Sequence, residues 1–246
     1  MSTGQGENRR KRAVMLIVVA TSVVVAVWIA LRPSGPRNSV AVRPAPAGAV
    51  QSSLTDDESA RVQRTIAAGR ITLPDQVAAL SQPADRDGPR GPGPLFSLIS
   101  PVGTAVRASR PQFTWSDAGA DAYTVTVFDE TSVEVARSTR VAGTSWTTSA
   151  DLRRGGTYRW QVTAHRGARN ETEPRPPRPE AKFIVLDAAA LVRVQAVEAR
   201  LAGEPLALGI LLAEAGLISE ARVDLTRATK VPATAAAARR LLESLP

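Results

Sequence analysis

The sequence contains no cysteine and only one histidine, His165. Without cysteine, the chain can form neither a disulfide framework nor a thiolate metal site. A single imidazole cannot build a histidine-rich metal cluster either. Lysine is also rare, with Lys11, Lys182 and Lys230 as its only examples, so the formal charge of +8 comes mainly from arginine. We therefore expect no metal and no cofactor.

A long uncharged segment covers residues 13–31, AVMLIVVATSVVVAVWIAL, with only Thr21 and Ser22 as polar interruptions. As a helix with a rise of about 1.5 Å per residue, it would cross the roughly 30 Å hydrocarbon layer of a bilayer. The basic run RRKR at 9–12 comes directly before it. Clustered positive charge is retained in the cytoplasm. We expect residues 1–12 to be a cytoplasmic tail, 13–31 to span the cytoplasmic (inner) membrane once, and the remainder to be extracytoplasmic.

A cleaved signal peptide is the alternative interpretation of this segment. Its apolar region is longer than signal peptides usually have, and no small-residue cleavage site follows WIALRPSG directly. The pattern favours an uncleaved anchor, and the question of cleavage stays open.

Linkers flank a short helical segment beyond the apolar run. Residues 32–51 are rich in Pro, Ala, Gly and Arg, which predicts an extended linker. In residues 52–82, Thr55 and Glu58 have capping-box spacing, and Gly69 stands where a helix would end. This segment is too small to fold alone, so we expect it to dock on the residues C-terminal to it. Residues 83–94 form a second linker.

Apolar residues alternate with polar ones between residues 95 and 187. The last two strands predicted from this pattern lie at 157–165 and 181–187. Strands with one apolar face, broken by turn residues, predict a sandwich of two antiparallel sheets.

Trp115 and Tyr123, followed by LRRGGTYRWQVTA at 152–164, resemble the fibronectin type III pattern. The resemblance implies a fibronectin III/immunoglobulin-like β-sandwich, with a buried tryptophan in the second strand and a tyrosine corner at Tyr158. The phrases SPVGT and PQFTW also resemble bacterial envelope proteins with such domains, some of them associated with extracytoplasmic sigma-factor systems. The structural residues implied are Trp115, Tyr123, Leu152, Tyr158, Trp160, Val162 and Ala164.

Helical spacing returns in residues 188–246, which predicts a small all-α C-terminal segment. The stretch 204–229 resembles one tetratricopeptide repeat, although Pro205 and Pro232 depart from that pattern. A lone repeat needs neighbouring helices for stability. The packing positions implied by this resemblance are Leu208, Gly209, Leu212, Ala221, Leu225 and Ala228.

Few side chains suggest chemistry. His165 lies on the predicted outward face of its strand, where we expect an exposed residue rather than a catalytic base. Carboxylates at predicted strand ends are expected to be solvated loop acids without a calcium-binding ligand run. These carboxylates are Asp117, Asp121, Asp129 and Glu130. Trp146 is the tryptophan whose inward position is least defined.

The sequence predicts a non-enzymatic, membrane-anchored interaction module that binds another envelope protein, in a signalling system as the resemblance implies. Two alternatives stay open. One is a carbohydrate- or cell-wall-binding accessory protein that uses the sandwich loops and Trp146. The other is an enzyme with a carboxylate-based site in those loops. Nucleic acid is not an expected partner, because the arginines form no single stripe.

Overall fold

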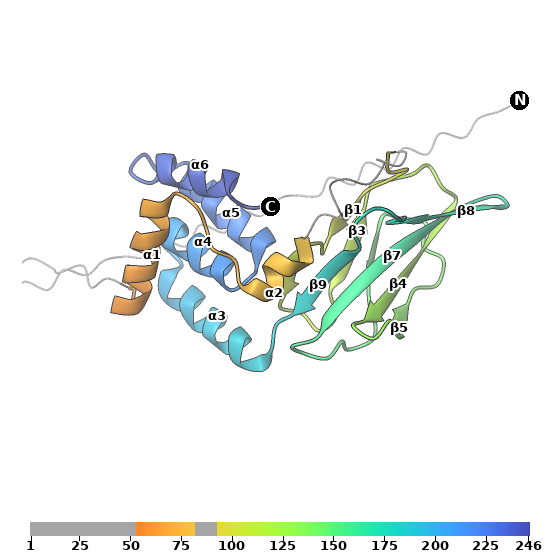
Figure 1. The fold of residues 1–246 in the computed structure, drawn as a ribbon, viewed down its shortest axis with the longest axis horizontal. Helices are drawn as coiled ribbons and strands as arrows, with labels where there is room; N and C mark the ends of the chain where they lie inside the picture. The colour runs from red at the N-terminus through yellow and green to blue at the C-terminus, as the bar shows by residue number, and fades with distance from the viewer. Residues whose placement is uncertain (1–52, 82–92) are drawn as a thin grey trace, which may run out of the picture. The chain divides into compact units, whose positions relative to one another are not determined.

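The computed structural model describes residues 53–81 and 93–246 (Figure 1). The predicted cytoplasmic tail, membrane span and first linker lie outside the described residues, as does most of the second linker. Among the helices that are described, none combines the length and the apolar character needed to cross a membrane.

Two β-sheets occupy the middle of the chain. The pairings are antiparallel, except that the second strand runs parallel to the ninth. The smaller sheet has the order β1 (Leu98–Ser100), β3 (Gln112–Trp115) and β6 (Ser145–Thr147). The larger sheet has the order β2 (Thr104–Val106), β9 (Ala181–Val185), β7 (Thr157–Arg166), β4 (Ala122–Asp129) and β5 (Glu134–Arg137), and β8 (Arg169–Glu173) pairs with β7.

An apolar core between the sheets is built from the inward-facing residues of both. Strand β7 alternates regularly between buried and half-buried residues, as expected for a strand with one face in the core. Aromatic side chains dominate this core. It contains Phe96, Phe113, Trp115, Tyr123, Val125, Val127, Leu152, Tyr158, Trp160, Val162, Ala164, Ala181, Phe183 and Val185. At this level the prediction of a β-sheet body is confirmed.

Helices form the rest of the described chain. In the first of them, Thr55 and Glu58 make the predicted capping box, and Gly69 ends the helix with φ of 66°. The several helices predicted at the C-terminal end are present. The elements are α1 (Asp56–Ala68), α2 (Asp75–Ala78) with a 3-10 turn (Ala79–Ser81), α3 (Ala188–Leu201), α4 (Pro205–Glu214), α5 (Ile218–Ala228) and α6 (Ala235–Glu243).

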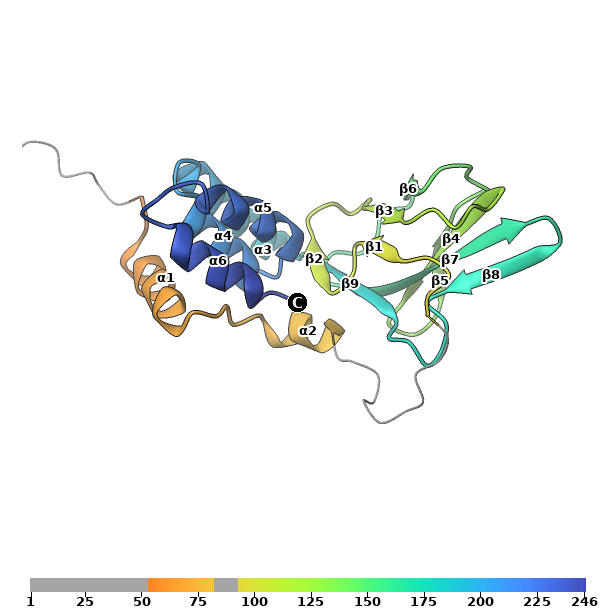
Figure 2. The ribbon, with the colours of Figure 1, turned by 90° about the horizontal axis from the view of Figure 1, so that it is seen from above.

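The N-terminal helices α1 and α2 pack on the C-terminal helices and share one apolar core with them (Figures 1 and 2). Val62 of α1 and Val77 of α2 enter this core together with Leu212 and Leu225 of the C-terminal helices. The chain therefore leaves the helical layer after α2, forms the two sheets, and returns to the same layer at α3. Neither helical segment closes this core without the other.

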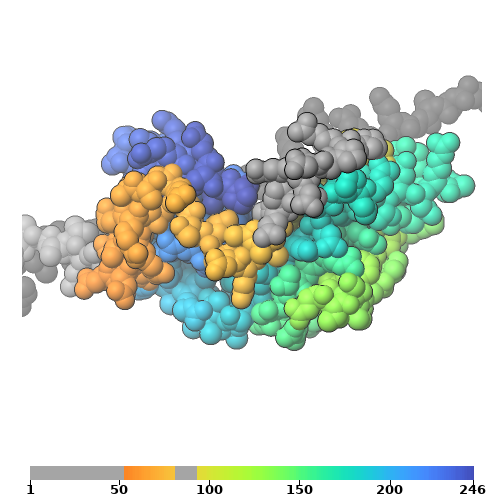
Figure 3. All heavy atoms as spheres, in the orientation of Figure 1, coloured from red at the N-terminus to blue at the C-terminus, as the bar shows by residue number. Residues whose placement is uncertain are grey.

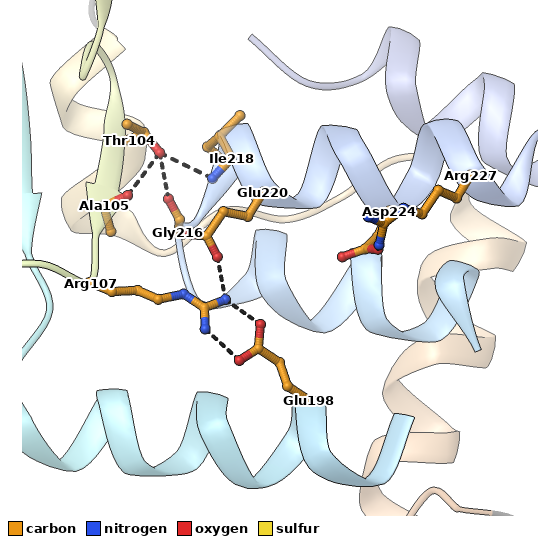
Figure 4. A network of polar contacts seen from close by, with 9 residues as sticks. All are labelled: Thr104, Ala105, Arg107, Glu198, Gly216, Ile218, Glu220, Asp224 and Arg227. Atoms are coloured by element: carbon orange, nitrogen blue, oxygen red, sulfur yellow. Dashed lines mark hydrogen bonds and ion pairs between the residues drawn. The ribbon is translucent and has the colours of Figure 1, made fainter. Parts of the chain in front are cut away.

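The sheets meet the helical layer at a junction made by β2 and by Arg107, which follows β2 (Figure 4). The backbone N–H of Ala105 donates to the carbonyl oxygen of Gly216 at 2.8 Å, in the turn between α4 and α5. The Thr104 hydroxyl oxygen lies 3.1 Å from the same carbonyl oxygen and accepts from the backbone N–H of Ile218 at 3.1 Å.

Arg107 completes the junction by forming ion pairs with Glu198 of α3 and Glu220 of α5. Hydrogen bonds from the guanidinium to the Glu198 carboxylate raise the pKa of Arg107, despite its partial burial. The junction thus connects one edge of the larger sheet to two different helices.

We predict that Gly216→Ala lowers the free energy of unfolding by about 2 kcal/mol or more. Gly216 has φ of 84°, and an added methyl carbon would lie 2.6 Å from a methyl carbon of Val77. The measurement is thermal or urea unfolding followed by circular dichroism.

Gly203→Ala is the matched control, because Gly203 is exposed and an added methyl group there meets no atom within 4 Å. We expect it to change stability by less than about 0.5 kcal/mol. Equal effects of the two substitutions would contradict the tight fit at the junction.

Candidate interaction groove

A groove of about 590 Å³ opens between α1, α2, α3 and α4, next to the point where β9 leads into α3. Figure 3 shows this side of the molecule, with α1 and α2 in orange to yellow and α3 in cyan. We call it the groove. Its volume falls within the roughly 300–1,000 Å³ range of pockets that bind ligands.

Helix α3 forms one wall of the groove. Asp187 caps its first turn, where the carboxylate accepts from the backbone N–H of Ala190 at 2.7 Å. Ala190, Val194 and Val197 recur at a spacing of three and four residues, so they line one face of the helix. This face gives the wall apolar surface, beside charged side chains of the same helix that also line the groove.

Helix α4 and the segment around α2 contribute further apolar surface to the groove. Leu211 and Ala215 come from α4 and its C-terminal cap, and Val77 comes from α2. Gln76, which is exposed, adds a polar group beside Val77. The lining of the groove therefore combines apolar side chains with polar and charged ones, and it comes from chain segments more than one hundred residues apart.

An ion pair between α1 and α3 forms part of the lining of the groove. The Arg200 guanidinium lies 2.6 Å from the Glu58 carboxylate, and it also donates to the carbonyl oxygen of Ser53 at 2.9 Å. The hydrogen bond from Arg200 lowers the pKa of Glu58 to about 2, although burial of the carboxyl group acts in the opposite direction. Glu58 is only 7% exposed, so the pair fixes the distance between the two helices.

A second polar contact connects α1 with α4. The Thr65 hydroxyl donates to the Glu214 carboxylate at 3.2 Å, and the Arg61 guanidinium lies 3.5 Å from the same carboxylate. Helix α1 is thus fixed to both of the helices that it faces across the groove.

The residues predicted to be structural in the sheets all lie in the core between them. The Tyr158 hydroxyl donates to the carbonyl oxygen of Arg153 at 3.0 Å, which is the backbone contact a tyrosine corner makes. The Trp160 ring N–H donates to the carbonyl oxygen of Pro101 at 2.7 Å. The buried set is Trp115, Tyr123, Leu152, Tyr158, Trp160, Val162 and Ala164.

The residues predicted to pack the C-terminal helices are buried as well. Gly209 of α4 lies so close to α5 that an added methyl carbon would be 2.8 Å from a side-chain carbon of Leu225. The buried set is Leu208, Gly209, Leu212, Ala221, Leu225 and Ala228. None of these residues was predicted to line a groove, and only Leu212 does so.

The candidate chemical groups take part in local hydrogen bonds. His165 is half-buried on β7, with its Nε2 2.9 Å from the Thr124 hydroxyl and its Nδ1 2.7 Å from the Asn170 side chain. Asp117 accepts from the Tyr123 hydroxyl at 2.6 Å and from the backbone N–H of Gly119 at 2.8 Å. The hydrogen bond from Tyr123 lowers the pKa of Asp117.

The remaining loop acids also organise turns. Asp129 accepts from the backbone N–H groups of Thr131 and Val133, both at 2.9 Å, and shapes the turn between β4 and β5. Asp121 accepts from the backbone N–H of Gly167 at 2.8 Å. Within residues 53–81 and 93–246, no cluster of three or more acidic or histidine side chains is placed to hold a metal ion.

A small hollow of about 240 Å³ contains Asp129, Glu130 and Asp151. Its other two carboxylates have nearby donors as well: Glu130 lies 3.3 Å from Arg153, and Asp151 lies 2.6 Å from Arg110. The acids therefore occupy turns and surface ion pairs.

Trp146 packs inward on the smaller sheet. Its ring stacks on the Phe113 ring with 5.6 Å between centroids, and its side chain is half-buried. The face of the ring that lies on Phe113 is therefore not available for stacking on a sugar.

Comparison with known proteins gave a partial likeness. No protein-family model and no curated protein matched the chain. A solved structure that is similar in part is the fn3 domain of the human collagen alpha-1(XX) chain, with 19% sequence identity and a TM-score of 0.31. The match covers 42% of this chain and 89% of that chain.

We predict that Glu58→Gln lowers the free energy of unfolding at neutral pH by about 1–3 kcal/mol, because it removes a charge-assisted pair. The folded pKa of Glu58 is about 2, below its ordinary value of 4.5. The stabilisation is therefore fully present above the ordinary pKa and is lost as the pH falls towards 2. Unfolding curves of the parent and the variant should converge between about pH 5 and pH 2.

Asp57→Asn serves as the control, since Asp57 is an exposed acid in the same first turn of α1. Its effect should be smaller and should not follow that pH course. A loss in Glu58→Gln that stays constant from neutral to acidic pH would contradict the pairing with Arg200.

Proposed function

We propose that this chain is a non-enzymatic, membrane-anchored interaction module that binds a peptide segment of another envelope protein in the groove. The groove is the observation that carries the proposal. It combines a volume of ligand-binding size, lined by both apolar and charged side chains, with walls fixed by ion pairs. A site of fixed shape binds with less loss of conformational entropy than a flexible one.

The proposal that the chain is not an enzyme is supported by the hydrogen bonds that the candidate catalytic side chains already make within the chain. Asp117, Asp121 and Asp129 accept hydrogen bonds within turns, and His165 lies between two neutral side chains. A general base must reach a substrate proton. Groups that already organise the backbone are poorly placed for that role.

In this proposal the sandwich is of the fibronectin type III kind, and α4 with α5 forms a tetratricopeptide-like pair. The hydrogen bond from Tyr158 to the Arg153 carbonyl and the buried Trp115 support the first assignment. The close approach of α4 and α5 at Gly209 supports the second. Residues 13–31 would anchor the module in the cytoplasmic membrane, and the sequence resemblance associates it with envelope signalling.

The topology can be tested with reporters fused at the C-terminus of the full chain. A reporter active only outside the cytoplasm should work there, because RRKR at 9–12 retains the N-terminus inside. A cytoplasmic reporter at the same position should be silent. The reverse result would remove the proposed membrane orientation and leave the groove untouched.

The groove can be tested by site-specific photocrosslinking in the full-length protein in its membrane. A photoreactive residue at Gln76, which lines the groove, should give a discrete adduct with a partner chain. Ala190→Trp, which fills the groove without changing its charge, should abolish the adduct.

Ala189→Trp is the matched control, because Ala189 is an exposed neighbour on α3 that does not line the groove. It should leave the adduct intact. An adduct that survives Ala190→Trp, or none at all, would contradict binding in the groove.

A further inference from the structure

We infer that the outer edge of β1, together with a hollow beside it, binds an extended apolar segment of a partner chain, which adds to the smaller sheet as a further strand. The hollow has a volume of about 430 Å³ and shares no lining residue with the groove. This second surface therefore goes beyond the proposed function and does not depend on it.

The backbone of β1 has one open edge, because among the described strands it pairs only with β3. The backbone N–H of Ser116 donates to the carbonyl oxygen of Ser97 at 2.8 Å. This bond lies directly beside the register pair of Leu98 and Trp115, which makes that pair a non-hydrogen-bonded one. The N–H and C=O groups of Leu98 therefore point away from β3, and within the described chain they have no hydrogen-bond partner. An extended segment alongside β1 would supply one.

The hollow beside this edge has a mostly apolar lining. Leu98 belongs both to the open edge and to the lining, so the hollow lies where side chains of an added strand would be. An added strand would thus gain backbone hydrogen bonds from the edge and apolar contact from the hollow. The apolar members of the lining are Leu80, Pro94, Phe96, Leu98, Val102, Pro174, Pro179, Ala181, Ile218 and Pro246.

The segment around β1 also exposes apolar side chains to solvent. Leu95 is 46% exposed, Ile99 60% and Val102 42%. Strand β8, which pairs only with β7 among the described strands, has the sequence RNETE and presents no apolar side chain at its edge. Exposed apolar residues gathered at one place mark interaction sites. The edge of β1 therefore has the surface that a docking strand needs.

The charged side chains in the lining of the hollow are already paired. Glu173 is only 2% exposed, and it accepts from the Arg178 guanidinium at 2.7 Å and from the backbone N–H of Leu95 at 3.2 Å. Glu180 lies 2.9 Å from the Lys182 ammonium group. The lining thus offers no unbalanced charge to a ligand, which favours an uncharged apolar segment over an acidic or a basic one.

The neighbouring segment of the chain itself does not have this chemistry. Residues 82–92, QPADRDGPRGP, contain three prolines and four charged residues, and Ala84 is their only other apolar residue. Proline cannot donate a hydrogen bond to a sheet. A partner segment with free backbone N–H groups and with apolar residues at alternate positions matches both the edge and the hollow.

The test is a selection of short random peptides displayed on phage against the full chain reconstituted in nanodiscs of neutral lipid. Among the peptides that tolerate Ala190→Trp, which fills the groove, we expect apolar residues at alternate positions. Val102→Arg places a charge in the apolar lining, so it should weaken the strongest of these peptides about tenfold or more in fluorescence polarisation. Because Val102 is 42% exposed, the unfolding curve of this variant should match that of the parent.

Methylation of single backbone nitrogens in the peptide distinguishes strand addition from the burial of side chains alone. Alternate N–H groups of a strand face the same neighbouring strand. Methylation of the nitrogen that pairs with the Leu98 carbonyl oxygen should weaken binding about tenfold. Methylation of the nitrogens on either side of it should have a smaller effect, because these point away from β1.

Val133→Arg is the matched control, because Val133 is a 58% exposed valine in the turn between β4 and β5 that does not line the hollow. It should leave the affinity unchanged. An equal loss in both arginine variants, or no selected peptide that is sensitive to Val102→Arg, would overturn the inference. Equal effects of methylation at every position would overturn it as well.

Two other occupants of the hollow would give different results. Self-association of the full chain that Val102→Arg abolishes would identify a second copy of this chain and overturn the inference. A large gain in peptide affinity on replacing residues 83–92 with a Gly-Ser linker of the same length would identify that segment as the occupant, with the same consequence. Failure of the groove would be seen separately, since Ala190→Trp alters the groove and no residue of the hollow.

Discussion

The hydrogen bond from the Ala105 N–H to the Gly216 carbonyl is the contact on which the arrangement of this molecule depends. One edge of β2 pairs with β9, and the other edge makes this contact with the turn between α4 and α5. An unpaired sheet edge exposes backbone groups that pair readily with other chains. Here a helical turn covers that edge, and Gly216 lets the turn approach because it carries no side chain.

The helical layer is built from two chain segments that lie on either side of the sheets in the sequence and share one core. Helix α1 has thirteen residues and α2 has four, lengths at which isolated helices are marginal in water. Their apolar residues share a core with the C-terminal helices and with Ala105 and Ile184 of the larger sheet. The two sheets lie between these segments in the chain, which returns to the helical layer at α3.

Local features were predictable from the sequence, because short-range rules decide them. The capping box at Thr55, the αL glycine at position 69 and the alternation along β7 all result from spacing within one element. Strand β8 was missed because its residues, RNETE, are all polar and show no alternation. It exists because β7 extends past β9 and offers a free edge to the returning chain.

The groove could not be predicted, because its lining depends on contacts between distant segments. The pairing of Glu58 with Arg200 joins residues 142 positions apart, and no spacing rule connects them. Helical spacing in residues 188–246 was visible in the sequence, but the face of α3 that lines the groove was not predicted. Periodicity indicates that a helix face is apolar, but it does not show whether another helix covers that face.

The open volume itself needs a physical reason, since protein interiors are usually packed to the density of organic crystals. Small side chains at Ala190 and Ala215 leave space beside Val194 and Leu211, and the ion pair between Glu58 and Arg200 prevents α1 from moving inward to fill it. Larger residues at the alanine positions would bury more apolar surface and stabilise the fold. A chain that keeps small residues and fixed walls at one place therefore retains an open volume and forgoes that stability.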